Sequence, residues 1–196
     1  MTEQEITYLK VKFPNAHFQS LEDLSISPAN SSKALDSTRH EYSAKLEAVN
    51  FDKVKEGWYQ SRFHDQVKSC DALYYHDNDY FLIEFKTGQV DGLDVFRKIY
   101  DSIIGLIEHN ILTLDDCRQH LNVILIANNA EESPNQPYAD RLLGLAEWTY
   151  PTEGDRWKKF LENLKNKDIR RLTNFLVKWA YRMTPDDFER YCMEKL

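Results

Sequence analysis

The clearest signals in the hydrophobic pattern lie in the middle of the chain, where two strand-like stretches flank a short polar cluster. Residues 70–75 and 80–86 are rich in apolar and aromatic side chains, and residues 76–79 between them are typical of a turn. The pattern therefore predicts a β-hairpin. A continuous apolar run, Leu121–Ala127, predicts a strand that is buried on both faces, as central or parallel strands usually are.

Helical periodicity predominates on either side of these strands. Apolar side chains at spacings of three and four predict a helix over residues 91–110 and a shorter one over Leu114–His120. The same spacing predicts two short helices between residues 37 and 60, with Asn50 as the cap of the second. Four helices are expected in the remaining chain, the last opened by Thr184 and a proline: residues 138–148, 156–164, 169–181 and 185–195.

The two ends of the chain are expected to differ from its middle. Residues 1–36 are expected to form an irregular N-terminal segment, with a short strand at residues 6–13 and a loop at residues 25–36. Residues 37–150 are expected to form an α/β core with a mixed sheet, and residues 151–196 a C-terminal helical extension packed on it. A chain of 196 residues is long enough to bury such a core.

Composition narrows the class of protein. Because 42% of the residues are hydrophobic and glycine and proline number only six each, a disordered or low-complexity chain is excluded. The three cysteines stand far apart without Cys-x-x-Cys spacing, which argues against a disulfide scaffold or a cysteine-rich zinc site. No apolar run approaches the roughly 20 residues of a membrane helix. We therefore expect a protein of the reducing cytoplasm that does not associate with membranes.

Charge is distributed unevenly along the chain. Residues 156–182 carry nine basic side chains and two acidic ones, a net +7, so that the rest of the chain is −14 for a total of −7. Two interpretations of this basic stretch stay open. It can contact a nucleic-acid backbone, with Arg170, Arg171 and Lys178 as the candidate residues, or it can be the solvated face of amphipathic helices.

The predicted hairpin carries the side chains of chemical interest. Glu84 and Lys86 are two residues apart on a strand and so lie on one face, while Ile83 and Phe85 point to the other. Asp71, at the start of the partner strand, is expected opposite about residue 85 and beside Glu84. Adjacent carboxylates repel each other, and a divalent cation relieves that repulsion. Mg²⁺ needs only one or two carboxylates, so the pattern predicts a Mg²⁺ site, with Mn²⁺ as the alternative ion.

Asp71 followed across a hairpin by Glu84-Phe85-Lys86 resembles the core motif of the PD-(D/E)XK nuclease superfamily. The resemblance covers roughly residues 40–127 and implies a restriction-endonuclease-like αβββαβ core with a mixed sheet. It also implies that Asp71 and Glu84 bind Mg²⁺ and that Lys86 assists the attacking water. Cys70 stands where the family motif has proline, which leaves the acidic ligand in place.

Other positions of the family pattern are less clearly matched. Residues 58–63 are the best candidate for the strand before Asp71. Family members often add a glutamate from the first helix, for which Glu47 is favoured over Glu41 and Glu56. On the helix after the motif, Lys98 and Tyr100 can contact a phosphate, although a solvated lysine and a core tyrosine are the favoured interpretation.

These residues support two functional hypotheses. The resemblance implies a Mg²⁺-dependent nuclease that hydrolyses phosphodiester bonds, with DNA preferred to RNA because it is the commoner substrate of the superfamily. Such a chain can act alone, as a homodimer, or as the nuclease subunit of a bacterial phage-defence system. The alternative is a non-catalytic module with a nuclease-like fold that binds a partner protein, for which the acidic remainder of the chain offers a contact surface.

Overall fold

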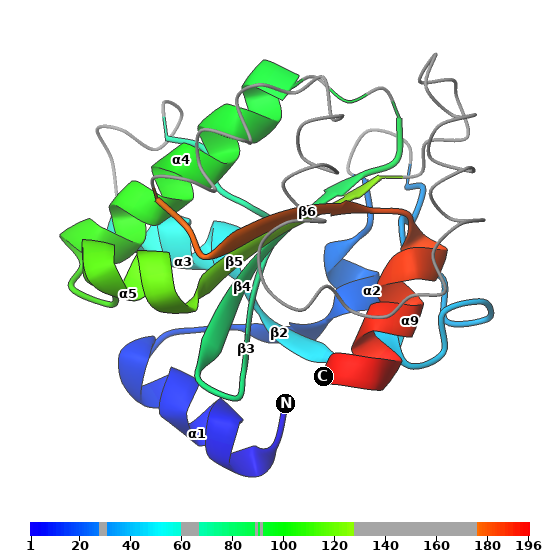
Figure 1. Cartoon of the computed structure of the whole chain (residues 1–196), viewed down its shortest axis with the longest axis horizontal. Coiled ribbons are helices and arrows are strands. Elements are labelled where there is room, and N and C mark those ends of the chain that lie inside the picture. Colours follow the sequence, from blue (N-terminus) through cyan, green and yellow to red (C-terminus); the bar gives the residue numbers. More distant parts are fainter. Residues whose placement is uncertain (28–30, 60–66, 89, 91, 128–175) are drawn as a thin grey trace.

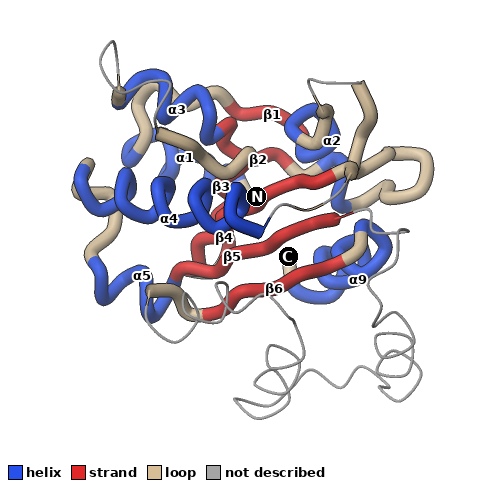
Figure 2. The backbone as a smooth tube through the Cα atoms, turned by 90° about the horizontal axis from the view of Figure 1, so that it is seen from above, coloured by secondary structure: helices blue, strands red, loops and turns tan. Residues whose placement is uncertain are grey.

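The computed structural model describes residues 1–27, 31–59, 67–88, 90, 92–127 and 176–196, and the structural statements below concern this part of the chain. Its centre is a six-stranded mixed sheet whose strands lie in chain order (Figure 2). The strands are β1 (Phe18–Ser20), β2 (Glu47–Asn50), β3 (Ala72–His76), β4 (Asp79–Lys86), β5 (Leu121–Ala127) and β6 (Trp179–Met183). Neighbours from β1 to β4 are antiparallel, whereas β5 is parallel to β4 and β6 is parallel to β5.

Helices cover both faces of the sheet (Figure 1). One face is covered by α1 (Glu3–Lys12), α3 (Phe51–Trp58), α4 (Gly92–Glu108) and α5 (Leu114–His120). The opposite face is covered by α2 (Leu21–Leu24) and α9 (Pro185–Lys195), and a 3₁₀ turn, η1 (Ser43–Lys45), precedes β2. The result is a three-layer α/β arrangement with a hydrophobic core on each side of the sheet.

Side chains of β4 alternate between the two cores. Leu82 packs in the core beneath α4, while Ile83 and Phe85 pack in the core beneath α2 and α9. Because side chains alternate along a strand, Glu84 and Lys86 continue the row of Leu82 on the α4 face. The predicted separation of Glu84 and Lys86 from their apolar neighbours is thereby confirmed. The partner strand β5 is buried over its whole length, as its apolar sequence predicts.

The predicted hairpin is confirmed, with a register one residue away from the expected one. Asp77 and Asn78 form its two-residue loop with φ angles of 46° and 66°, which Asp and Asn tolerate better than other non-glycine residues. Since Ala72 pairs with Ile83, Asp71 lies opposite Glu84 and not opposite residue 85. The carboxylates of the two strands are therefore direct neighbours.

Helices with strong end signals also lie where the sequence predicts them. α5 begins at a capping box formed by Thr113 and Asp116, in which each side chain accepts a hydrogen bond from the other residue's backbone N–H. α9 begins at Thr184, whose hydroxyl caps the helix, with Pro185 in its first turn. Asn50 caps α3 as predicted.

The N-terminal prediction is wrong in its secondary structure. Residues 6–13 lie mainly in helix α1 and not in a strand, because Thr2 and Glu5 form a capping box at the start of the chain. β1 and α2 follow, and Leu9 and Leu21 are fully buried in the two cores. The first 24 residues therefore belong to the folded core and are not an irregular segment.

Two further strands replace predicted helices. The first of the two helices expected after residue 37 does not form in the described residues 37–50. β2 lies there instead and is the strand that precedes Asp71. Trp58 ends α3, so the described start of the 58–63 candidate strand is helical, and residues 60–66 lie outside the described residues. Near the C-terminus, β6 occupies the described end of the helix expected over residues 169–181.

The C-terminal part of the chain thus supplies both a strand of the central sheet and helix α9. The helices expected over residues 138–148 and 156–164 lie outside the described residues. Among the described helices, none is long and apolar enough to span a membrane.

Candidate functional site

Five charged side chains meet at the C-terminal end of β4, on the sheet face covered by α4. Asp71 immediately precedes β3, Glu84 and Lys86 lie on β4, and Asp94 and Lys98 lie one turn apart on α4. We call these five residues the acid–lysine cluster. It unites three consecutive elements of the chain, because the antiparallel hairpin brings Asp71 beside Glu84 and α4 crosses back over both strands.

The two lysines hold the three carboxylates in place. Lys98 Nζ lies 2.7 Å from Glu84 Oε1 and 3.2 Å from Asp71 Oδ1. Lys86 Nζ lies 3.2 Å from the same Glu84 oxygen and donates a hydrogen bond of 2.9 Å to Asp94 Oδ2. Lys98 therefore sits between the carboxylates of the two strands, while Lys86 connects Glu84 to the first turns of α4.

Glu84 is the most strongly perturbed member of the acid–lysine cluster. Its side chain is 0% exposed, and its Oε2 atom has no hydrogen-bond partner among the described residues. Burial, followed by the neighbouring Asp71 carboxylate, raises the pKa of Glu84 to about 8, although both lysines oppose the shift. A buried carboxyl group with one unpartnered oxygen is costly, which is typical of sites retained for function.

Asp71 is more fully satisfied. Its Oδ2 atom accepts a 2.7 Å hydrogen bond from the backbone N–H of Phe85, and Oδ1 accepts one from Lys98. Burial raises the pKa of Asp71, while Lys98 and the Phe85 N–H oppose that shift. Asp52, in the first turn of α3, adds a repulsive negative charge nearby and accepts a hydrogen bond from Ser69.

The carboxylates are the metal-binding candidates. Within the described part of the chain, no group of three or more His, Cys, Asp and Glu side chains is arranged to hold a metal ion. Asp71 and Glu84 nevertheless provide two carboxylates whose oxygens both lie within 3.2 Å of one point, the Lys98 nitrogen. Mg²⁺ commonly takes one or two protein carboxylates and completes its shell with water and substrate oxygens.

A cavity of about 210 Å³ opens beside the acid–lysine cluster. Asp71, Lys86 and Lys98 line it, so the cavity gives access to these three charged groups. The other lining residues come from the end of β4, the turn after it, the end of α2 and the segment after α2: Phe85, Thr87, Gly88, Leu24, Ser25, Ile26 and Ser27.

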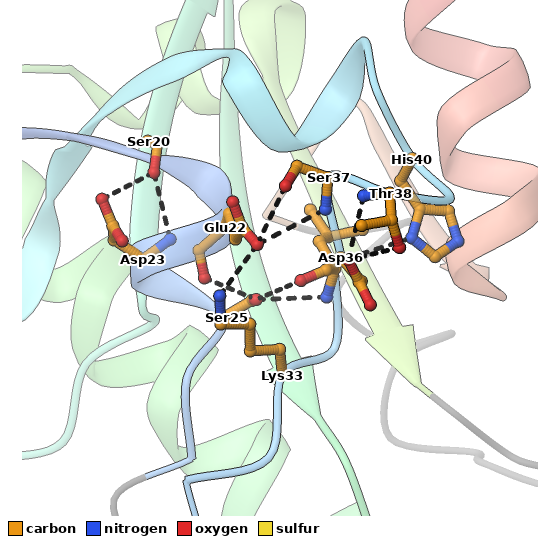
Figure 3. A network of polar contacts seen from close by, with 10 residues as sticks. Ser20, Glu22, Asp23, Ser25, Lys33, Asp36, Ser37, Thr38 and His40 are labelled. Atoms are coloured by element: carbon orange, nitrogen blue, oxygen red, sulfur yellow. Dashed lines mark hydrogen bonds and ion pairs between the residues drawn. The ribbon is translucent and has the colours of Figure 1, made fainter.

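The segment after α2 is fixed by a network of polar contacts (Figure 3). The buried Ser25 hydroxyl donates to the backbone carbonyl of Glu22 at 2.8 Å and accepts from the Leu35 N–H at 3.1 Å. Glu22 also accepts hydrogen bonds from Lys33 and Ser37. These contacts hold in place a segment that lines the cavity.

Two of the weaker predicted residues lie outside the acid–lysine cluster, which contradicts the metal-ligand prediction for Glu47 and leaves the nucleic-acid contact of Lys178 a prediction. Glu47 is exposed on β2, four residues before the level of Asp71, which corresponds to roughly 13 Å along the strand. Lys178 is ion-paired with Asp79 at 2.8 Å, at the opposite end of β4 from Lys86 and roughly 23 Å away. Neither residue belongs to the acid–lysine cluster. Arg170 and Arg171 lie outside the described residues.

Sequence reasoning identified three members of the cluster and misjudged a fourth. The solvated lysine expected at position 98 is wrong, because the Lys98 side chain is only 19% exposed and pairs with two carboxylates. The core tyrosine expected at position 100 is also wrong, since Tyr100 is 42% exposed. The i, i+4 spacing of Asp94 and Lys98 was the available signal, because it places both on one face of the helix after the motif.

Comparisons with known proteins do not assign the chain to a family. No family model, curated protein or solved structure matches it. Its chemistry therefore has to be inferred from the acid–lysine cluster and from the cavity beside it.

Proposed function

We propose that the chain is a Mg²⁺-dependent nuclease that hydrolyses phosphodiester bonds in DNA, with the acid–lysine cluster as its active site. The observation that carries this proposal is the meeting of Asp71, Glu84 and Lys86 on one face of the hairpin beside an accessible cavity. Replacing buried ion pairs by apolar side chains often stabilises a protein. A buried acid–lysine cluster that lines a cavity is thus better explained by chemistry than by stability.

The donor set fits a hard divalent cation. Glu84 Oε2 is buried without a hydrogen-bond partner in the described structure, and the remaining donors are carboxylate oxygens, the ligands that Mg²⁺ and Mn²⁺ prefer. Asp71 and Glu84 would hold the ion. When bound, such an ion acidifies a coordinated water and screens negative charge on a phosphate.

Lys86 is suited to act as a fixed cation. Burial lowers the pKa of Lys86, but Glu84 and the hydrogen bond to Asp94 outweigh burial and raise it overall. The side chain therefore stays protonated at neutral pH and serves as a hydrogen-bond donor, not as a general base. Because Lys86 lines the cavity, its ammonium can orient an attacking water or stabilise the charge that develops on a phosphodiester.

The topology supports a restriction-endonuclease-like core as part of this proposal. The antiparallel strands β2, β3 and β4 are followed by helix α4 and by β5 parallel to β4, the order that the αβββαβ arrangement requires. Helix α3, between β2 and β3, is an addition to that arrangement. The proposed ligands Asp71 and Glu84 lie on the second and third of these antiparallel strands or at their ends.

Two substitutions test the proposal. Glu84→Gln keeps the shape of the side chain but removes the charge for the metal, whereas Lys86→Ala leaves both metal ligands intact. We expect both variants to lose about 10²–10³-fold in cleavage rate, and only Glu84→Gln to lose Mg²⁺ affinity in calorimetry. Lys45→Ala is the matched control, since Lys45 is an exposed lysine that pairs with Glu41 outside the acid–lysine cluster.

The assay uses plasmid and single-stranded DNA with Mg²⁺, with Mn²⁺ and with EDTA, and an RNA substrate of matched length reports on substrate class. Cleavage that depends on Mg²⁺ and disappears in both site variants supports the proposal. Cleavage at the wild-type rate in Glu84→Gln and Lys86→Ala would place the chemistry elsewhere.

One observation favours a second candidate, a non-catalytic assembly module. Lys98 already compensates the carboxylates of Asp71 and Glu84, so the cluster is able to exist without a metal. This alternative expects neither Mg²⁺ binding nor cleavage from the purified wild-type protein. The same calorimetric titration therefore distinguishes the two candidates.

A further inference from the structure

Lys98 occupies the position that a cation shared by Asp71 and Glu84 would take. Its Nζ atom lies 2.7 Å from Glu84 Oε1 and 3.2 Å from Asp71 Oδ1, whereas Mg²⁺ binds oxygen at about 2.1 Å. An ammonium and a metal ion cannot both occupy the space between these two oxygens. They would also repel each other strongly at such a separation.

We propose that Lys98 is an internal cation that competes with Mg²⁺ for the Asp71–Glu84 pair, and that metal binding releases its ammonium into the adjoining cavity. This inference rests on the proposed metal-dependent activity, since it describes how the same site is controlled. The cavity is available to the released group because Lys98 already lines it. A lysine has four flexible methylene groups, so its ammonium can move without a shift of α4.

The exchange changes the charge of the site. With Lys98 in place, the carboxyl groups of Asp71, Glu84 and Asp94 face the ammonium groups of Lys86 and Lys98. A bound Mg²⁺ brings two positive charges, so the site becomes more positive even where the ion displaces a proton from Glu84. The metal-bound site therefore attracts a phosphodiester more strongly than the metal-free site does.

The released Lys98 then has a defined role. It joins Lys86, which also lines the cavity, so that two ammonium groups face an anionic substrate next to the ion. The expected order of binding follows from this exchange, because Mg²⁺ has to enter before a phosphodiester is favoured. Lys98 thus protects the carboxylate pair in the metal-free protein and contacts the substrate phosphate in the loaded one.

The first experiment measures metal affinity without any nucleic acid. Lys98→Met keeps most of the length of the side chain and removes its charge. We expect Lys98→Met to bind Mg²⁺ and Mn²⁺ at least about tenfold more tightly than the wild type in isothermal titration calorimetry. Lys178→Met is the matched control, because it removes an ion-paired lysine at the opposite end of β4 and should leave metal affinity unchanged.

A second experiment uses the wild-type protein, which keeps the inference testable if Lys98→Met fails to fold. Reductive methylation followed by mass spectrometry reports how accessible each lysine amine is. We expect Lys98 to resist methylation in EDTA and to become reactive when Mg²⁺ is added, while Lys178 reacts equally in both conditions. A Lys98 that stays protected although Mg²⁺ binds would overturn the inference.

The outcomes separate this inference from the proposed function. Tighter metal binding by Lys98→Met than by the wild type supports the exchange, even if the wild type binds Mg²⁺ too weakly to measure. Equal or weaker binding by Lys98→Met, with cleavage intact in the wild type, overturns the exchange and leaves the nuclease proposal standing. Absence of both metal binding and cleavage in all the proteins overturns both.

Discussion

Glu84→Gln should change the way in which the stability of the metal-free protein depends on pH. Burial raises the pKa of Glu84 to about 8 in the folded protein, whereas a glutamate in an unfolded chain has a pKa of about 4.3. Between these values the folded protein holds a proton that the unfolded chain has released. Because the folded state then binds more protons, the free energy of unfolding falls as the pH rises through this window.

The magnitude follows from proton linkage. One proton taken up on folding changes the free energy of unfolding by at most about 1.4 kcal/mol for each pH unit. Solvent does not screen this effect on the free energy of unfolding, since the Glu84 side chain is 0% exposed. A domain is stable by only about 5–15 kcal/mol in total, so the effect is large enough to measure. Glu84→Gln removes the titrating group, and its stability curve should be flatter by about 1 kcal/mol per pH unit.

The assay is urea denaturation in EDTA at a series of pH values from about 5 to about 8. Glu47→Gln is the matched control, because Glu47 is exposed and should leave the slope of the wild type unchanged. Addition of Mg²⁺ should reduce or reverse the slope in the wild type, since the metal favours the ionised carboxylate. Parallel curves for the wild type and Glu84→Gln in EDTA would show that the lysines keep Glu84 ionised, and would refute the reasoning.

Three further substitutions test other parts of the structure. Asp94→Asn weakens the anchor of Lys86 and should slow cleavage about tenfold without changing Mg²⁺ affinity, as outer ligands of a site typically do. Ser25→Ala deprives the Leu35 N–H of its side-chain acceptor in the cavity wall, and should lower the free energy of unfolding by about 1–3 kcal/mol in urea titration. Thr184→Ala removes the cap of α9 and should lower thermal stability by about 1 kcal/mol in calorimetry.

The elements that could be predicted from the sequence are those with local signals. The β3–β4 hairpin has two strands rich in apolar and aromatic residues around a turn of Asp and Asn, and β5 is a continuous apolar run. The capping residues Thr113 and Thr184 mark the starts of α5 and α9. In each case neighbouring residues determine the structure, so that tertiary contacts need not be known.

The wrongly predicted elements depend on contacts between distant residues. β2 is only four residues long and becomes a strand because it pairs with both β1 and β3. β6 has side chains at helix-compatible spacings, but its backbone pairs with β5. α1 lacks a clear apolar stripe, and its start depends on the capping box of Thr2 and Glu5. Sheet pairing overrides local preference in the first two cases.

In the candidate site, too, the residues positioned by local patterns could be predicted and those positioned by tertiary packing could not. Asp71, Glu84 and Lys86 could be found because strand alternation and one hairpin register determine how they meet. The position of Lys98 depends on how α4 crosses the sheet, which no local pattern gives. The favoured third ligand, Glu47, is expected on a helix, but the structure has strand β2 there, and Glu47 lies four residues from the level of Asp71.

The position of the acid–lysine cluster explains how its charged groups can be partly desolvated and still accessible to a ligand. Beyond Leu82, the row of side chains on the α4 face of β4 changes from apolar to charged at the edge of the core. A charge at this edge can be partly desolvated, which strengthens its interactions, and can still reach a cavity through which an ion or a phosphate enters. Deeper in the core, the same carboxylates would have no access to a ligand. On the open surface, water would screen them and their pKa values would not be raised. The end of a central strand, covered by a helix that supplies a lysine, provides both partial desolvation and access to a ligand.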